Sequence, residues 1–207
     1  MSEKANFSNI YTFYDLINTV LTFGFDKSWR EKAVSNLIGK SVLDLGSGTG
    51  AAYEQLLNFE TTAIDPDKKM LELNAFDNKV LGTAENLPFQ DNSFDNVFCS
   101  FVWRNVSDTN IALNEVYRVL RPGGRFILLD MTRPKNSFLR MLHKIGTFKV
   151  LHLIGLITFN LKEYRFLYKS LDFYPQPEEH LNKDNFIDLK IERMGVFNFV
   201  YLAVFTK

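Results

Sequence analysis

Cysteine and histidine are scarce in this sequence of 207 residues. The one cysteine, Cys99, cannot form an internal disulfide, and its apolar neighbours predict a buried, unreactive thiol in a reducing cytosol. The three histidines lack the spacing of metal ligands, so no metal is expected. Residues 1–9 are polar and contain no apolar run of the kind that a signal peptide needs.

Net charge and long hydrophobic runs are also missing. The 24 basic and 24 acidic residues cancel, which argues against a strongly basic nucleic-acid binder, and no nucleic-acid partner is expected. The most apolar stretch, 138–159, is interrupted by basic residues. Its uncharged part, 150–161, is shorter than the roughly 20 residues that cross a bilayer. We therefore expect a cytoplasmic protein with at most peripheral membrane contact.

Phenylalanine is abundant instead, with 20 residues. Such a content fits either a large aromatic core or an aromatic-lined pocket for a flat, apolar ligand. The chain length suits one domain, which can bury a core without a metal or a disulfide.

Short apolar segments alternate with helical patterns in the middle of the chain. This alternation predicts an α/β fold with a mostly parallel, doubly wound, Rossmann-like sheet of seven strands. Strands are expected at 41–45, 61–64, 79–81, 96–101 and 125–129, and a terminal strand pair at 187–206 around Gly195. Helices are expected at 51–57, 67–76 and from Ser107 or Asp108 to Leu120.

The segments divide a single domain into four parts. Residues 1–39 read as N-terminal lid helices, 40–133 as the cofactor-binding core, 134–175 as a helical insertion after the fifth strand and 186–207 as the terminal strand pair. In the first part, Ser28 and Glu31 have the spacing of a capping box, which predicts a helix that begins there and ends at Gly39.

A glycine-rich loop, Gly46-Ser47-Gly48-Thr49-Gly50, follows the first strand and fits two templates. One is the loop of Rossmann-like methyltransferases and the other is a dinucleotide fingerprint. Asp44 lies inside the strand and Asp65 follows about 20 residues later, where it can accept ribose hydroxyls. Carboxylates beside the loop favour a cationic sulfonium and ammonium over a pyrophosphate. The plain alternative for Asp44 is a strand-end acid that caps loop amides.

A second polar patch, 82–89, follows the third expected strand. It could hold an adenine through hydrogen bonds, or it could be an ordinary turn, because Pro, Asn and Asp dominate turns.

Together, these segments resemble the class I S-adenosylmethionine-dependent methyltransferases. The resemblance rests on the loop 42–50, the acid of Ile64-Asp65, the segment 84–89 and the turn 118–124. It implies S-adenosyl-L-methionine as the cofactor and S-adenosyl-L-homocysteine as its product. It assigns cofactor contacts to Asp44, Gly46, Ser47, Gly48, Gly50, Asp65, Ala84, Glu85 and Ser100.

More narrowly, the sequence resembles the ubiquinone/menaquinone biosynthesis C-methyltransferases of the UbiE type. The residues that carry this likeness are 14–18 with Phe23-Gly24 and Trp29-Arg30, 100–106, and 164–175. Departures from the family pattern include Thr83 for Asp, Val102 and Trp103 for Gly and Leu or Ile, Lys169 for Glu, and Asp26 for His. The family's C-terminal Gly pair is not evident either. Most of these departures are expected near the pocket for the methyl acceptor.

The resemblance implies a small lipophilic acceptor, a quinol of the demethylmenaquinol kind. Arg104 is the expected cation beside the developing phenolate, Asn105 would bind the acceptor or hold the cofactor, and Tyr14 would close over the site. The alternatives are an ion pair of Arg104 with Glu115 or Asp108, and a packing role for Tyr14.

Residues 138–159 are expected to cover a polyprenyl tail or to rest against an anionic membrane. A helical pair that packs on the domain, or a homodimer contact, is the alternative.

Three other functions stay open at the level of the sequence. They are methyl transfer to another lipid or small aromatic, cofactor binding without chemistry, and an NAD-dependent dehydrogenase.

Overall fold

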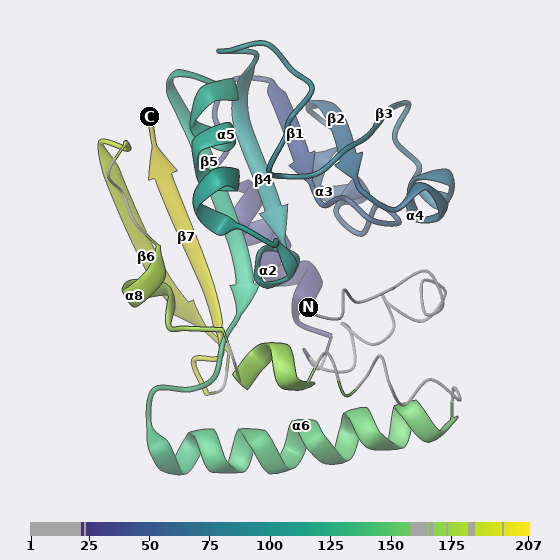
Figure 1. Cartoon of the computed structure of the whole chain (residues 1–207), viewed down its shortest axis with the longest axis vertical. Coiled ribbons are helices and arrows are strands. Elements are labelled where there is room, and N and C mark those ends of the chain that lie inside the picture. Colours follow the sequence, from purple (N-terminus) through teal and green to yellow (C-terminus); the bar gives the residue numbers. More distant parts are fainter. Residues whose placement is uncertain are drawn as a thin grey trace.

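The computed structural model describes residues 22, 24–157, 165, 168–172, 174–181, 185–195 and 197–207. Its centre is a seven-stranded sheet with the order β3-β2-β1-β4-β5-β7-β6 (Figure 1). Neighbouring strands from β3 to β5 pair in parallel, and β7 pairs antiparallel with both β5 and β6. The expected Rossmann-like, mostly parallel sheet with an antiparallel terminal pair is confirmed.

The elements follow the expected alternation. The strands are β1 (Ser41–Leu45), β2 (Glu60–Asp65), β3 (Asn78–Leu81), β4 (Phe94–Ser100), β5 (Leu120–Met131), β6 (Asp188–Met194) and β7 (Val200–Thr206). The helices are α2 (Asp26–Val34), α3 (Tyr53–Leu56), α4 (Lys68–Leu73), α5 (Thr109–Val119), α6 (Ser137–Ile157) and α8 (Pro177–His180), with a 3-10 turn, η2 (Trp103–Asn105).

Alternate residues of the strands build two separate cores, one on each face of the sheet. On one face Leu43, Val97 and Phe126 pack with the inner side of α5, while on the other face Val42 and Phe98 pack with residues of α2 and α3. A parallel sheet covered on both faces needs strands that are apolar at nearly every position. The run Phe126–Leu129 of β5, which is buried at every position, is the clearest case.

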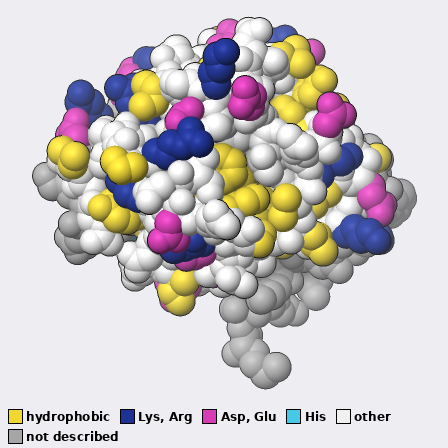
Figure 2. Space-filling model, turned by 90° about the horizontal axis from the view of Figure 1, so that it is seen from above, with side chains coloured by type: hydrophobic (Ala, Val, Ile, Leu, Met, Phe, Trp, Pro, Cys, Tyr) yellow, Lys and Arg dark blue, Asp and Glu magenta, His cyan; other side chains and the backbone are white. Residues whose placement is uncertain are grey.

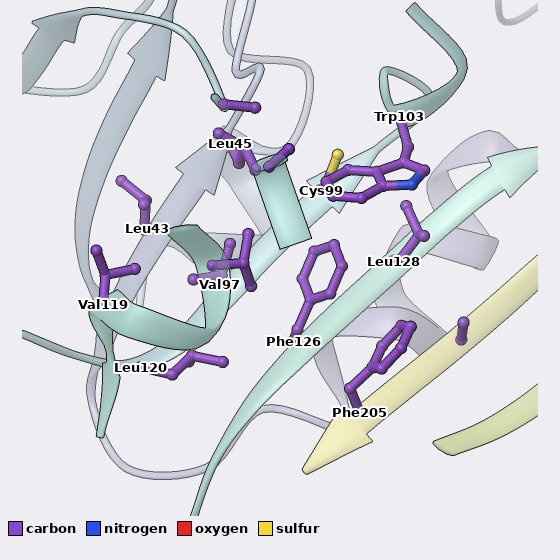
Figure 3. Packing of buried hydrophobic residues seen from close by; sticks show 14 of the residues in the cluster. Leu43, Leu45, Val97, Cys99, Trp103, Val119, Leu120, Phe126, Leu128 and Phe205 are labelled. Carbon is purple, nitrogen blue, oxygen red and sulfur yellow. The ribbon is translucent and has the colours of Figure 1, made fainter. Parts of the chain in front are cut away.

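The face that α5 covers contains Cys99 and Trp103, which lie beside Leu128 in Figure 3. Cys99 is fully buried, as its apolar neighbours in the sequence led us to expect, and burial raises the pKa of its thiol well above the usual range. Trp103 is 1% exposed and its ring centroid lies 5.1 Å from that of Phe126. Trp103 is therefore packed in the core on this face of the sheet, and its place near an acceptor pocket stays a prediction.

The helix that contains Trp29 begins earlier and ends earlier than expected. It starts at Asp26, after a turn in which the Phe25 amide donates to the Thr22 carbonyl, and it ends at Val34. Asp26 belongs inside the helix because it makes a buried ion pair, 2.7 Å long, with Arg30 one turn later. The capping box of Ser28 and Glu31 is thus wrong, and so is the end at Gly39.

The two ends of the sheet have different surroundings. The long helix α6 runs across the end toward which β4 and β5 point (Figure 1). The opposite end, seen in Figure 2, carries basic and acidic side chains interspersed with apolar ones. None of the helices in the described ranges is long and apolar enough to span a bilayer.

Candidate cofactor and acceptor site

The loop after β1 is held in a conformation that requires glycine. Gly46, Gly48 and Gly50 have φ angles of +71°, +52° and +91°. The amides of Gly46 and Ser47 both donate to the carbonyl of Ile64 in β2, at 2.8 and 3.0 Å. A Cβ on Gly46 would lie 2.4 Å from Cγ1 of Val102, so the loop also passes close to the chain that follows β4.

Asp65, at the end of β2, fixes the second half of the loop. Its Oδ2 accepts from the Gly48 amide at 2.9 Å and its Oδ1 accepts from the Asp67 amide at 2.8 Å. Burial raises the pKa of Asp65, and the two amide bonds oppose that rise. A carboxylate offers about four acceptor positions, so both oxygens can still accept from ribose hydroxyls.

A pocket opens where β1 and β4 end. The described residues that line it are Arg30, Asp44, Gly46, Ser47, Gly48, Thr49, Ala51, Ala52, Ser100 and Val102. Five of the nine predicted cofactor residues therefore share one wall: Asp44, Gly46, Ser47, Gly48 and Ser100. Gly50 and Asp65 do not line the pocket, but they fix the conformation of the loop.

Asp44 is the most unusual residue of this pocket. It is 2% exposed, and its Oδ2 has no hydrogen-bond partner in the part of the chain that the structure describes. Burial raises the pKa of Asp44 to about 7, and Asp65 adds to the rise while Arg30 opposes it. A buried carboxyl oxygen without a partner is costly, so Oδ2 suits a cationic ligand.

Ala84 and Glu85 do not line this pocket. Ala84 lies in the core beneath α5. The Oε1 of Glu85 accepts from the amides of Ser107 and Asp108, at 2.8 and 3.3 Å, and so fixes the approach to α5. Thr83, close to both, makes an isolated bridge with Asn86. The patch is a structured turn in this state, and its role toward an adenine stays a prediction.

Arg104 and Asn105 lie in η2, four and five residues beyond the pocket residue Ser100. Arg104 is ion-paired through Nη1 to Asp130 of β5, and Nη1 also donates to the Phe101 carbonyl at 3.1 Å. The arginine and aspartate side chains are 3% and 0% exposed. The Oδ1 of Asn105 is buried without a partner among the described residues.

The alternative partners considered for Arg104 are wrong. Glu115 pairs with Arg118 at 2.7 Å and accepts from the Leu87 amide at 2.8 Å. Asp108 caps α5 by accepting from the amides of Asn110 and Ile111. Strand pairing decides the matter, because β4 and β5 are neighbours and Asp130 lies one residue beyond the last paired position, Leu129.

Two further residues complete the account of the site. Tyr14 lies outside the described residues. Arg30 was not among the predicted site residues, yet it lines the pocket from α2 and is 4% exposed. The Trp29-Arg30 pair, which contributed to the family resemblance, was the signal that could have identified it.

Comparison with known proteins agrees with this geometry. The model of the ubiE/COQ5 methyltransferase family matches residues 3–188. Relatives named "Ubiquinone/menaquinone biosynthesis C-methyltransferase UbiE" include one from Rickettsia bellii, 36% identical, and one from Rickettsia akari, 34% identical. Each alignment has 194 positions and covers 84% of this chain and 78% of the relative.

Solved structures show the same fold. A SAM-dependent methyltransferase from Thermotoga maritima aligns with a TM-score of 0.69 and 21% identity, over 98% of this chain and 100% of its own. One from Aquifex aeolicus aligns with a TM-score of 0.54 and 17% identity, over 91% and 92%. Of the two templates that the glycine loop fits, these comparisons favour the methyltransferase loop over the dinucleotide fingerprint.

Proposed function

Because the chain belongs to the ubiE/COQ5 methyltransferase family and is an S-adenosylmethionine-dependent methyltransferase, we propose that it methylates a ring carbon of a quinol. The acceptor is a quinol of the demethylmenaquinol kind. The Rickettsia relatives, which are named for ubiquinone and menaquinone biosynthesis, support this assignment. The observation that carries it is the buried Arg104–Asp130 pair at the end of β4, directly beyond the cofactor pocket.

The pocket residues fit S-adenosylmethionine. Bound there, the cofactor supplies a methyl group on an electrophilic sulfonium. Asp44 and Ser47 line the pocket and each has a buried oxygen without a partner among the described residues, which an ammonium bound there would satisfy. Asp65 is placed to accept from the ribose, and the glycines keep side chains out of the path of the ligand.

The chain's contribution to C-methylation is alignment and charge stabilisation. A quinol ring carbon becomes nucleophilic when a ring hydroxyl has lost its proton, so a nearby cation lowers the barrier. We assign that cation to Arg104, which Asp130 and the Phe101 carbonyl hold in place before any acceptor binds. This charge is buried, where screening by water is weak, and the Asp130 carboxylate offsets part of it. Asn105 presents a buried acceptor oxygen close by, for the acceptor or for the cofactor.

Residues 1–39 are proposed to close the site, with Tyr14 above the acceptor. Positioning of the donor and the acceptor by such a cover can supply roughly 7–11 kcal/mol of the barrier. The described part of this segment already contributes Arg30 to the pocket.

The outer face of α6 is proposed to contact the membrane in which a polyprenyl quinol is dissolved. Seven large apolar side chains, 41–61% exposed, follow one stripe along the helix: Phe138, Met141, Leu142, Ile145, Phe148, Leu153 and Leu156. The helix contains Arg140, Lys144 and Lys149 and no acidic residue, although Lys144 pairs with Asp172. This composition matches an anionic lipid surface.

The test of the proposed reaction uses methyl-labelled S-adenosylmethionine, the purified protein and demethylmenaquinols of several tail lengths. We expect a carbon-methylated quinol that carries the label, detected by mass spectrometry. Absence of label on every quinol, from protein shown by calorimetry to bind S-adenosylhomocysteine, would count against the proposal.

A second candidate is methyl transfer to another lipid or small aromatic. The observation that favours it is Val102, which stands where the resembled family has glycine and packs against Gly46 at the pocket. Transfer of label to a component of a total lipid extract, and not to any quinol, would decide for this candidate. Cofactor binding without transfer to any acceptor would indicate a non-catalytic binding protein.

A further inference from the structure

Arg30 is held rigidly at the cofactor pocket. Its Nη1 donates to Oδ2 of Asp26 at 2.7 Å, and its Cζ lies 5.2 Å from the ring centroid of Phe101. The Asp26 carboxylate is itself fixed by the Thr22 hydroxyl, which donates to Oδ1 at 3.2 Å. The Arg30 side chain is 5% exposed, so its guanidinium cannot turn toward water without leaving these contacts.

One donor of this guanidinium is unused. The Nε of Arg30 is buried and has no hydrogen-bond partner within the described ranges of the chain. Leaving a buried donor of a charged group unpaired costs more than leaving a neutral one unpaired. Such a group in a pocket calls for an anionic partner, because ionised acceptors make the strongest hydrogen bonds to guanidinium.

The same pocket contains unused acceptors of the opposite kind. The Oδ2 of Asp44 and the Oγ of Ser47 are also buried without partners there. Arg30 and Asp44 interact electrostatically, since the charge of Arg30 opposes the rise in the pKa of Asp44. Arg30 nevertheless makes its ion pair with Asp26. A cationic donor and an acidic oxygen that both lack partners among the described residues thus belong to residues of one pocket. They match a ligand that carries a negative and a positive group.

We propose that Nε of Arg30 donates to the carboxylate of the amino-acid end of S-adenosylmethionine. This assignment makes Arg30 a binding residue of the cofactor, provided by the N-terminal segment and not by the glycine loop. It does not depend on which methyl acceptor the protein uses. No bond is made or broken in the step, so only affinity is expected to change.

The test compares two ligands that differ in one group. Calorimetry measures the affinity of the protein for S-adenosylhomocysteine and for its decarboxylated analogue, which keeps the amine and lacks the carboxylate. We expect the wild-type protein to bind the decarboxylated analogue roughly ten- to a hundredfold more weakly. Equal affinities of the wild-type protein for the two ligands would overturn the proposal, even if every variant failed to fold.

Variants then assign the difference to Arg30. Arg30→Met is expected to weaken S-adenosylhomocysteine by a similar factor and to leave the decarboxylated analogue within about threefold. Arg30→Lys, which keeps the charge, is expected to recover part of the loss. Lys27→Met on the same helix, where Lys27 is exposed and paired with Glu54, is the matched control and should change neither affinity. A loss of the same size for both ligands in Arg30→Met would mean that Arg30 only shapes the pocket, and would contradict the proposal.

Discussion

Three residues of the site lower the stability of the fold and are suited to bind the ligand. Asp44, Ser47 and Arg30 each bury a polar atom that lacks a partner among the described residues. Natural proteins keep few such groups, and those they keep often serve a ligand. The place of the glycine loop and of Asp44 at the cofactor pocket was predictable from the sequence. The unpaired Nε of Arg30 was not, because it depends on how α2 packs against β5 and α3 and on the stacking of Arg30 over Phe101.

Asp44→Asn is expected to stabilise the protein. An ordinary Asp loses its proton near pH 3.8 when unfolded, whereas burial keeps Asp44 protonated up to about pH 7 in the folded state. The native state thus binds more protons between these values, and stability falls as pH rises through that window. The loss reaches about 4 kcal/mol above pH 7.

Thermal unfolding measured at pH 5 and pH 8 checks this prediction. The variant should unfold at a higher temperature than the wild type, with the larger gain at pH 8. Its affinity for S-adenosylhomocysteine should fall at least tenfold, and wild-type affinity should weaken as pH drops below 7. A pH-independent difference in stability would show that the Asp44 carboxyl does not titrate in this range.

Removal of one partner of the buried Arg104–Asp130 pair is expected to be costly. Arg104→Met leaves Asp130 buried without its ion pair and should lower the free energy of unfolding by about 3–5 kcal/mol. The double variant Arg104→Met, Asp130→Asn should recover part of this loss. Arg121→Met is the control, since Arg121 is 48% exposed in its pair with Asp95 and should cost less than about 1 kcal/mol.

The same variants separate stability from function. Arg104→Lys, which retains a charge for Asp130, should bind S-adenosylhomocysteine nearly as well as the wild type and turn over more slowly. Unchanged turnover in Arg104→Lys and in the double variant would show that Arg104 has no part in catalysis.

At the scale of elements, the order of helices and strands was predictable, but several local details were not. Alternation of apolar strands with helices is a property of neighbouring residues, so it can be read from sequence. The start of α2 and the direction of Trp103 depend on distant partners: the Asp26–Arg30 pair requires an earlier helix start, and η2 turns the indole inward onto Phe126.

The contact between the loop after β1 and the segment after β4 gives a prediction at this scale. Gly46→Ala places a Cβ at positive φ, which costs about 1–2 kcal/mol, and drives it into Val102. Gly123→Ala has a similar φ, +78°, with open space around the new Cβ, so it isolates the conformational cost.

Chemical denaturation of these variants measures the clash. Gly46→Ala should be less stable than Gly123→Ala, and Val102→Gly in the Gly46→Ala background should reduce the difference. If Val102→Gly brings no recovery, the close packing of the loop against Val102 is not what limits this position.

At the scale of the whole molecule, the surface is asymmetric. The end of the sheet in Figure 2 has mixed charges, whereas α6 at the other end presents an apolar stripe without acidic residues (Figures 1 and 2). The sequence predicted an apolar helical region after β5. Which side of it would be exposed followed only from the packing of His143 and Leu151 on the inner face.

Sedimentation with lipid vesicles tests the role of α6. Phe138→Gln, Ile145→Gln and Leu153→Gln together should reduce binding to anionic vesicles at least tenfold, with little binding of any form to zwitterionic vesicles. The control replaces exposed leucines elsewhere: Leu57→Gln, Leu73→Gln and Leu81→Gln. A change in oligomeric state without a change in vesicle binding would assign the stripe to a homodimer contact instead.

The crystal structure of the protein soaked with S-adenosylhomocysteine is the most direct test of the central claim, that the pocket beside the glycine loop holds the methyl donor. We predict density for the ligand with its amino-acid end between Arg30 and Asp44 and its ribose at Asp65. An adenosyl ligand bound elsewhere, with a different molecule in this pocket, would contradict the account.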